Sequence, residues 1–262
     1  MGADGAVPPH HVVRSEILDY QTYEDAREAE RARIFKVKRP RRIHLGEHLT
    51  FLFENHDTIR YQVQEMARAE RIVRESSIRE EIDTYNQTLG GSGHLGCVLL
   101  IEIEEEARRK PLLEEWMGLQ EHLFMELADG TRVYAEYDLT QIGDRRLSAV
   151  QYLTFSVSDA PVALGCDLPA LEGTVALDEG QRSALAKDLA ATTNVSKLTP
   201  RRACIPAPTR SPSAVSDQSL ATSRHSWSII SLRCLAARVI SSDSSVSNGS
   251  VSSLLTCWAS ST

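Results

Sequence analysis

The spacing of hydrophobic residues switches repeatedly between a helical and a strand period along the chain, up to about residue 190. Five segments predict helices: residues 23–37, 57–75, 78–89, 104–120 and 178–189. In these segments either apolar residues recur every three or four positions or charged residues surround an alanine-rich stretch. Short apolar or alternating runs predict strands at residues 41–54, 97–103, 122–127, 132–137 and 149–157, with a further apolar piece at 161–165. The turn sequence ADGT at 128–131 predicts a hairpin between two of these strands.

This mixture of helices and short strands predicts an α+β fold, with an antiparallel sheet partly covered by helices. We expect residues 1–22 to form a loose N-terminus and residues 23–191 to form a single domain. The remaining residues, 192–262, differ in composition. From Ser196 onward 19 of 67 residues are serine, and no apolar period is sustained. Such a segment cannot bury enough surface to offset its chain entropy, so we predict a disordered tail.

Charge is distributed unevenly between these two parts. The chain carries a net charge of -7, but residues 196–262 hold seven Lys and Arg against two Asp. The preceding residues therefore hold 22 basic and 34 acidic side chains, a net charge of −12. Nucleic-acid binding requires a basic surface that neutralises phosphates, so the acidic body argues against nucleic acid as the main partner.

Cysteine spacing and the termini indicate a cytoplasmic protein. None of the five cysteines forms a CxxC pair, which argues against a zinc ribbon or a thioredoxin-like site. Cys97 lies in an apolar run and is expected to be buried, whereas Cys166 follows a glycine and is expected to be more accessible. The N-terminus lacks the pattern of a secretory signal, and the apolar run at 227–240 is too short to span a membrane. We therefore expect no membrane association.

The stretch RRIHLGEHLTFLFENHDT, residues 41–58, contains three of the eight histidines. On a helix His44 and His48 would be neighbours able to share one metal ion, whereas on a strand they would lie about 13 Å apart. Gly46 and the Thr and Phe residues that follow favour a strand. These two histidines are therefore not expected to form a metal site by themselves.

Two acidic residues interrupt otherwise apolar faces in this region. Glu47 falls on the apolar face of the predicted strand, and Glu70 falls within the apolar stripe of the following helix. A buried carboxylate requires a cation, a metal ion or a proton. If strand and helix fold back on each other, both acids reach the end where Arg41 and His44 lie. The alternatives are a buried Arg–Glu ion pair and a pocket of Glu70, Glu47 and His44 that binds iron, manganese or zinc or performs acid–base chemistry.

The segment LTFLFENHDTIRYQVQEM, followed by Arg68 and Glu70, resembles a bacterial family known as domain of unknown function 3501. The resemblance extends from about Tyr23 to Leu189, and includes the LLIEI, AVQYLTF and PVALGCDLP segments. The polar positions of this sequence that match the family motif, hereafter the motif residues, are Glu54, Asn55, Gln62, Gln64, Glu65 and Glu70. The resemblance assigns no catalytic residue.

What the resemblance implies about function comes from gene neighbourhood. Genes of this family often lie near those for rubrerythrin, an iron-containing protein that detoxifies peroxide, and near genes for iron–sulfur proteins. This association implies a non-catalytic accessory factor in redox or peroxide-stress metabolism, with a rubrerythrin-like or iron–sulfur protein as partner. The alternative is a metal-binding protein or enzyme with a carboxylate pocket around Glu70, and a third hypothesis is a small-molecule sensor.

Overall fold

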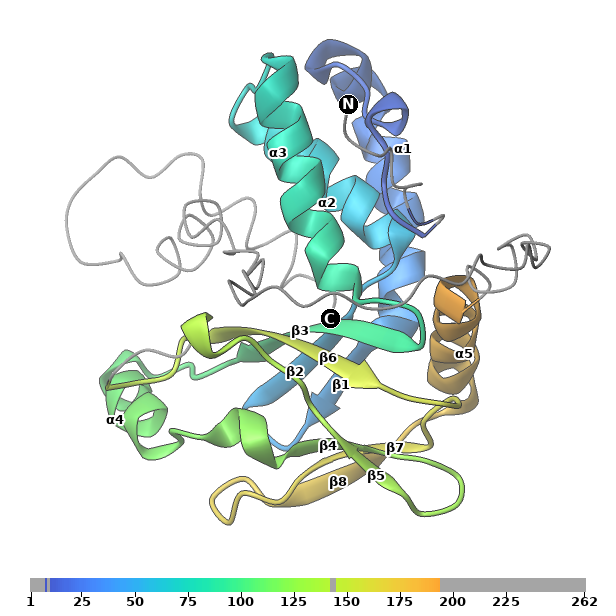
Figure 1. The fold of residues 1–262 in the computed structure, drawn as a ribbon. Coiled ribbons are helices and arrows are strands. Elements are labelled where there is room, and N and C mark those ends of the chain that lie inside the picture. Colours follow the sequence, from blue (N-terminus) through green and yellow to red (C-terminus); the bar gives the residue numbers. More distant parts are fainter. Residues whose placement is uncertain (1–7, 9, 142–144, 194–262) are drawn as a thin grey trace, which may run out of the picture.

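The computed structural model describes residues 8, 10–141 and 145–193 (Figure 1). Residues 192 and 193 of the predicted tail end the last described helix, and the rest of the tail, from residue 194 onward, lies outside the described residues. Helices and antiparallel strands make up the described fold, which confirms the predicted α+β class. The boundaries predicted for the domain stay a prediction.

The strands form two four-stranded antiparallel sheets. Sheet A has the order β1 (Arg42–Leu45), β2 (Leu49–Phe53), β3 (His94–Ile101) and β6 (Val150–Ser156). Sheet B has the order β5 (Arg132–Tyr134), β4 (Leu123–Glu126), β7 (Ala163–Cys166) and β8 (Gly173–Ala176). Because side chains alternate along each strand, every strand of sheet A sends one set of apolar residues towards sheet B.

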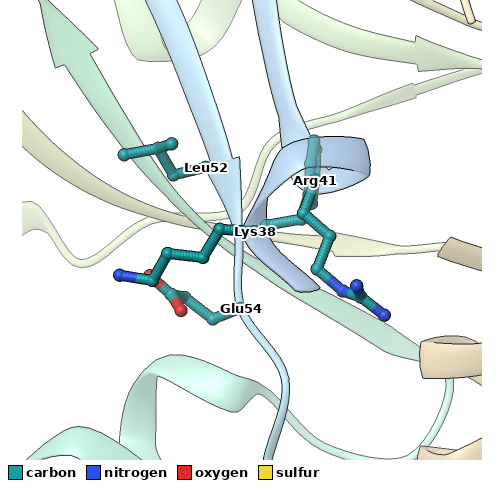
Figure 2. A pocket seen from close by; sticks show the side chains of 5 residues that line it. Lys38, Arg41, Leu52 and Glu54 are labelled. Atoms are coloured by element: carbon teal, nitrogen blue, oxygen red, sulfur yellow. The ribbon is translucent and has the colours of Figure 1, made fainter. Parts of the chain in front are cut away.

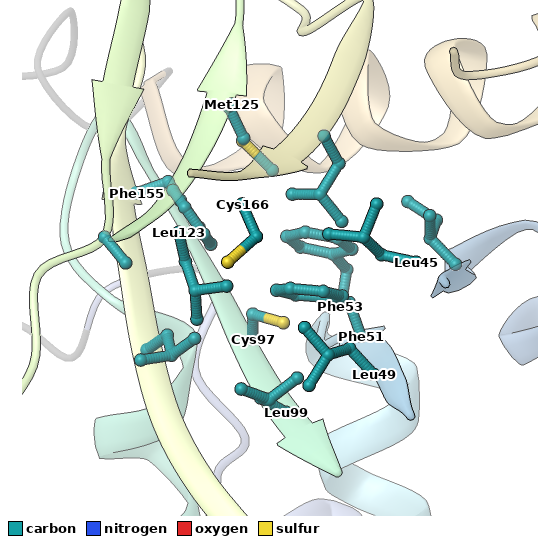
Figure 3. Close-up of a cluster of buried hydrophobic side chains, with 14 of the residues drawn as sticks. Leu45, Leu49, Phe51, Phe53, Cys97, Leu99, Leu123, Met125, Phe155 and Cys166 are labelled. Carbon is teal, nitrogen blue, oxygen red and sulfur yellow. The ribbon is translucent and has the colours of Figure 1, made fainter. Parts of the chain in front are cut away.

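The two sheets pack face to face around the main hydrophobic core (Figure 3). Phe51 and Phe53 from sheet A meet Leu123 and Met125 from sheet B, and all four are at most 2% exposed. At one edge the sheets are joined by a bridge between Glu136 and Thr154, and at the other β1 contacts β8. The strands therefore enclose a flattened, nearly closed core.

Both cysteines of the described chain lie in this core. Figure 3 shows Cys97 and Cys166 pointing inward from the two sheets, and each is 1% exposed. Burial raises the pKa of both thiols above their usual value. The prediction that Cys97 is buried is confirmed, whereas the expected accessibility of Cys166 is wrong, because β7 turns its side chain into the core.

Three helices form a layer that stands on one side of sheet A (Figure 1). They are α1 (Tyr20–Lys38), α2 (His56–Ala69) and α3 (Glu75–Asn86), and short 3-10 turns η1 (Arg14–Glu16), η2 (Arg39–Arg41) and η3 (Gln87–Leu89) complete the helical layer. The helices contact mainly one another and meet the sheet through η2 and η3. Pro40 lies in η2, directly after α1, where a proline cannot continue the helix.

Two further helices and two further 3-10 turns complete the described fold. Helix α4 (Glu106–Glu115) and η4 (Leu119–His122) connect sheet A to sheet B, and η5 (Leu139–Gln141) precedes β6. Helix α5 (Glu179–Thr193) returns from sheet B to contact η2 and β3. No helix within the described ranges is long and apolar enough to cross a membrane.

Several predicted boundaries differ from the structure. The single strand predicted for residues 41–54 is a hairpin, because Gly46 adopts a φ of +62°, which glycine reaches without strain, and the chain reverses before β2. The helix predicted for 57–75 ends at Ala69. Strand β8 was not predicted at all. Within the predicted loose terminus, Val12 and Ile17 are buried against α2 and α3.

Candidate functional site

The motif residues begin where β2 ends and α2 begins. Asn55 is the N-cap of α2: its side-chain oxygen accepts a hydrogen bond from the Thr58 backbone N–H at 3.0 Å, and the Thr58 hydroxyl oxygen accepts one from Asn55 N–H at 2.8 Å. The Asn55 amide also donates to the Asp188 carboxylate of α5 at 3.1 Å. One motif residue therefore both starts a helix and ties it to a segment 133 residues away.

A buried ion pair lies beside this cap. The Arg41 guanidinium of η2 donates two hydrogen bonds to Asp188, at 2.7 and 2.8 Å, and a third to the Val37 carbonyl at 2.6 Å. Arg41 and Asp188 are 8% and 9% exposed, so both charges are removed from water. In this bidentate ion pair the two buried charges neutralise each other, and the pair joins η2 to α5.

Glu54 has a different environment, although it is the neighbour of Asn55. It is buried, and it lines a cavity of about 20 Å³, enough for one water molecule, together with Lys38, Arg41, Leu52 and Phe53. Figure 2 shows the Lys38 amine on the same side of the strand as the Glu54 carboxyl, while the Arg41 guanidinium points away from them.

Burial raises the pKa of the Glu54 carboxyl above its usual value, although the positive charge of Lys38 and a hydrogen bond from Thr58 act in the opposite direction. Lys38 also lies over the Tyr61 ring, with 5.4 Å between its amine and the ring centroid. Among the motif residues, Glu54 is thus a buried acid poised to hold or release a proton beside a small cavity.

Glu65 is the acid most thoroughly satisfied by its neighbours. It accepts a hydrogen bond of 2.6 Å from the Tyr23 hydroxyl and two from the Arg27 guanidinium at 2.8 and 2.9 Å, and Arg68 lies 3.4 Å away. Burial alone would raise the pKa of Glu65, but the bonds from Arg27 and Tyr23 outweigh burial and hold it below the usual value. This cluster fastens α1 to α2.

The two glutamines of the motif also bond to other segments. Gln64 accepts a hydrogen bond from the Leu18 N–H at 2.9 Å and donates one to the Leu18 carbonyl at 3.0 Å, as a neighbouring strand would. Gln62 donates to the hydroxyl of Tyr85 on α3. Motif side chains on α2 therefore hold the N-terminal segment, α1 and α3.

The residues predicted to form a metal or acid–base pocket are placed differently. Glu70 is exposed and is the C-cap of α2, so the prediction that it is buried in the apolar stripe is wrong. Glu47 and His44 are exposed on the β1–β2 hairpin. Figure 1 shows α2 leading away from the sheets instead of folding back across β2, so that its far end lies away from the hairpin.

Other contacts occupy the hairpin residues. His44 Nδ1 is 2.9 Å from the Thr50 hydroxyl, which donates to the Glu102 carboxylate at 2.5 Å. Across the described ranges, no group of three or more His, Cys, Asp or Glu side chains is placed to hold a metal ion. The donor set predicted for iron, manganese or zinc therefore does not fit a metal site here. The alternative, a buried Arg–Glu pair of Glu70 or Glu47, is wrong as well, because Arg41 pairs with Asp188.

Sequence reasoning did not identify the partners Lys38, Asp188, Tyr23 and Arg27. Their contacts join residues far apart in the chain, which local periodicity does not report. One signal was available for Asp188: it interrupts the alanine- and leucine-rich segment ALAKDLAA. A charged residue in such a segment indicates a buried partner only once the facing element is known.

Comparisons with known proteins agree with this description. The sequence model of DUF3501, described as a protein of unknown function, matches residues 11–189. A crystal structure of a protein of unknown function from Burkholderia pseudomallei is similar, with a TM-score of 0.63 and 32% sequence identity over 68% of this chain and 98% of that one. A search of the curated proteins found no match.

Proposed function

The chain belongs to the DUF3501 family. We propose the role that the gene neighbourhood of this family implies: a non-catalytic accessory factor in redox or peroxide-stress metabolism of the bacterial cytoplasm. It would act through contacts with a rubrerythrin-like or an iron–sulfur protein. The redox part of this proposal comes from the family resemblance, and the accessory part is supported by the geometry of the motif.

The observation that supports an accessory role is that the motif side chains bond to other segments of the same chain. Asn55 binds Asp188, Gln64 binds the Leu18 backbone, and Glu65 binds Tyr23 and Arg27. Polar groups that satisfy one another rigidify the structure and hold several segments in one arrangement. The motif therefore builds a rigid body suited to presenting its surface to another protein.

The proposal is tested by mixing the purified chain with the purified rubrerythrin-like and iron–sulfur proteins of its own bacterium. Sedimentation should show a complex of fixed stoichiometry with one of them, and the partner's rate of peroxide reduction or electron transfer should change on binding. The chain itself should show no turnover of peroxide. Absence of a complex with either protein, or turnover by the chain alone, would contradict the accessory role.

A second candidate function is favoured by Glu54. A buried carboxyl with a raised pKa, next to Lys38 and a cavity, is the kind of group that performs acid–base chemistry or binds a small ligand. The pocket proposed here is centred on Glu54, whereas the sequence predicted one around Glu70. At least one member of a panel of small ligands should then raise the melting temperature of the wild-type chain.

The shift in melting temperature should disappear in Glu54→Gln, which keeps the size of the side chain but cannot ionise. Glu102→Gln, an acid outside the cavity, is the matched control and should retain the shift. If no compound shifts the melting temperature, or if Glu54→Gln responds as the wild type does, the pocket at Glu54 has no ligand-binding role.

A further inference from the structure

The turn between α2 and α3 contains a residue in an unfavourable backbone conformation. Helix α2 ends in a Schellman motif: Ile72 N–H donates to the Ala67 carbonyl at 2.9 Å, and Arg71 N–H donates to the Arg68 carbonyl at 3.2 Å. Arg71 occupies the left-handed position of this motif, with a φ of 52°, and no other non-glycine residue of the described chain has a positive φ. Glycine is the usual residue there, because it alone avoids the steric cost.

Arg74, three residues later, is also at odds with its position. It is the N-cap of α3, and its side chain makes no capping hydrogen bond. Helix N-caps favour Ser, Thr, Asp or Asn, and the positive end of the helix dipole disfavours a cation. Asp19 of α1 and Asn55 of α2 follow this preference, whereas Glu105, the N-cap of α4, also makes no capping hydrogen bond.

An apolar side chain projects between the two arginines. Val73 is 75% exposed, whereas Ile72 beside it packs against the buried cluster of the helical layer. Tyr20, which is 44% exposed, begins α1 at the same end of the layer, since Glu24 pairs with Arg68 near the end of α2. No ion pair or hydrogen bond engages the Arg71 or Arg74 guanidinium within the part of the chain that the structure describes.

Three neighbouring residues thus depart from what local physical chemistry favours, and within the described fold no hydrogen bond or ion pair of the two guanidinium groups compensates. Such departures concentrate at functional positions. We propose that residues 71–74, the RIVR turn, form a docking surface for another protein, with Arg71 and Arg74 binding acidic side chains and Val73 entering an apolar spot between them. This inference rests on the accessory function proposed above, and it names the surface and the chemistry of the partner.

Only the charge at the turn itself favours acidic side chains on the partner. Residues 1–195 carry a net charge of −12, so the body as a whole repels an acidic protein. The turn between α2 and α3 lies at the tip of the helical layer, away from the sheets in Figure 1, and its two arginines, which stand between Glu70 and Glu75 in the sequence, offer acidic side chains a local attraction. Opposite charges at an interface fix its register and raise its association rate more than its affinity, and binding should therefore weaken as salt is added.

The test uses the full chain and the same two purified partners, with the double variant R71G/R74S and the single variant Val73→Ser. The double variant replaces each arginine with a residue that its backbone position favours, so its melting temperature should rise. Its dissociation constant for the partner should increase about tenfold or more, and that of Val73→Ser about fivefold. Arg108→Ser, which removes an exposed charge from α4, is the control and should leave binding unchanged.

The outcomes separate this inference from the proposed function. If the wild type forms a complex and the double variant binds equally well, the docking surface lies elsewhere while the accessory role stands. If the wild type binds neither protein, both are overturned. Binding to vesicles of anionic lipid that R71G/R74S abolishes, without a protein complex, would replace the protein partner with a membrane surface.

Discussion

The two-sheet core and the helical layer are held together by different forces. Between the sheets the contacts are apolar, with Phe51, Leu123 and Met125 fully buried. Between the helices, charged and amide side chains do much of the joining: Glu65 to Arg27, Gln64 to Leu18, and Asn86 to both the N–H and the carbonyl of Val12. The apolar core tolerates changes of shape, but each polar link needs both partners.

This difference indicates where the family motif acts. Apolar burial is non-directional and can hold sheets together with many sequences. Hydrogen-bonded polar links are directional, and they fix how the helices are oriented relative to the sheets. Three of the motif residues, Asn55, Gln64 and Glu65, lie at such links, so their main effect is on the position of the helical layer.

The largest effect is expected from Gly96→Ala, at the contact between the two regions. A Cβ at Gly96 would lie 1.8 Å from the Thr88 carbonyl oxygen, and the backbone of η3 or of β3 must move to admit it. We expect a loss of about 4 kcal/mol or more in the free energy of unfolding, measured by urea denaturation.

Gly91→Ala is the matched control for this change, because a Cβ there would meet its nearest neighbour, in the His94 ring, at an ordinary 3.6 Å. It should alter the free energy of unfolding by less than about 0.5 kcal/mol. Equal effects of the two substitutions would show that the close approach at Gly96 does not hold the helical layer in place.

The next largest effect is expected from Glu65→Leu within the helical layer. Removal of the carboxylate leaves Tyr23 and Arg27 without their partner, which should cost about 3 kcal/mol of stability. Glu65→Gln keeps the size and one acceptor, and should cost about half as much. Leu123→Val in the apolar core, with a smaller cost of about 1 kcal/mol, provides the comparison.

These costs are measured by chemical denaturation, with circular dichroism at 222 nm following the helices and tryptophan fluorescence following the core. If Glu65→Leu proves as stable as the wild type, the Glu65 cluster contributes nothing net, and apolar packing holds the helices as it holds the sheets.

A smaller and pH-dependent effect separates Glu54 from Glu65. The pKa of Glu54 is raised by burial, so its contribution to stability is full below the unfolded value, near 4.5, and is lost as pH rises through the folded pKa. The pKa of Glu65 is lowered by its hydrogen bonds, so its contribution is present above about 4.5 and is lost as pH falls through the folded pKa.

Glu54→Gln should therefore gain stability relative to the wild type as pH rises from about 4.5, by at most about 1.4 kcal/mol per pH unit. As pH rises through the acidic range in which Glu65 ionises, Glu65→Gln should become less stable relative to the wild type. Urea denaturation from pH 2 to pH 8 measures both. A constant difference between Glu54→Gln and the wild type would mean that Glu54 titrates as an exposed acid does.

The fold class could be predicted from hydrophobic spacing because most strands and helices carry their period locally. Sequence reasoning failed where one residue decides the course of the chain. Gly46 was interpreted as part of a strand although it turns a hairpin, and the end of α2 was missed because Arg71, not glycine, takes the left-handed position. The strand β8 was missed because only Val175 of its four residues is strongly apolar.

The candidate site was predictable only in part, and for a related reason. Glu54, Asn55 and Glu65 were identified as motif positions through the family resemblance. Their partners were not, because Asn55 and Asp188 are 133 residues apart and Glu65 and Tyr23 are 42 apart. Burial of Glu70 was inferred from helical spacing that assumed a longer α2, and the helix ends at the residue before it.

The smallest expected effect concerns the RIVR turn, where Arg71 takes the left-handed backbone conformation that glycine usually occupies. Arg71→Gly removes the steric cost of the left-handed conformation, and should raise the free energy of unfolding by about 1 kcal/mol. The gain is limited because glycine also increases the entropy of the unfolded chain.

Arg71→Ala separates the two contributions of this residue. It removes the guanidinium but keeps the Cβ and its steric cost, so its stability should match that of the wild type. If Arg71→Gly and Arg71→Ala are equally stable, the strain at residue 71 is negligible, and the arginine needs no functional reason to be there. A gain in Arg71→Gly alone, measured by urea denaturation, means that the chain keeps a costly residue at an exposed turn, as a docking surface requires.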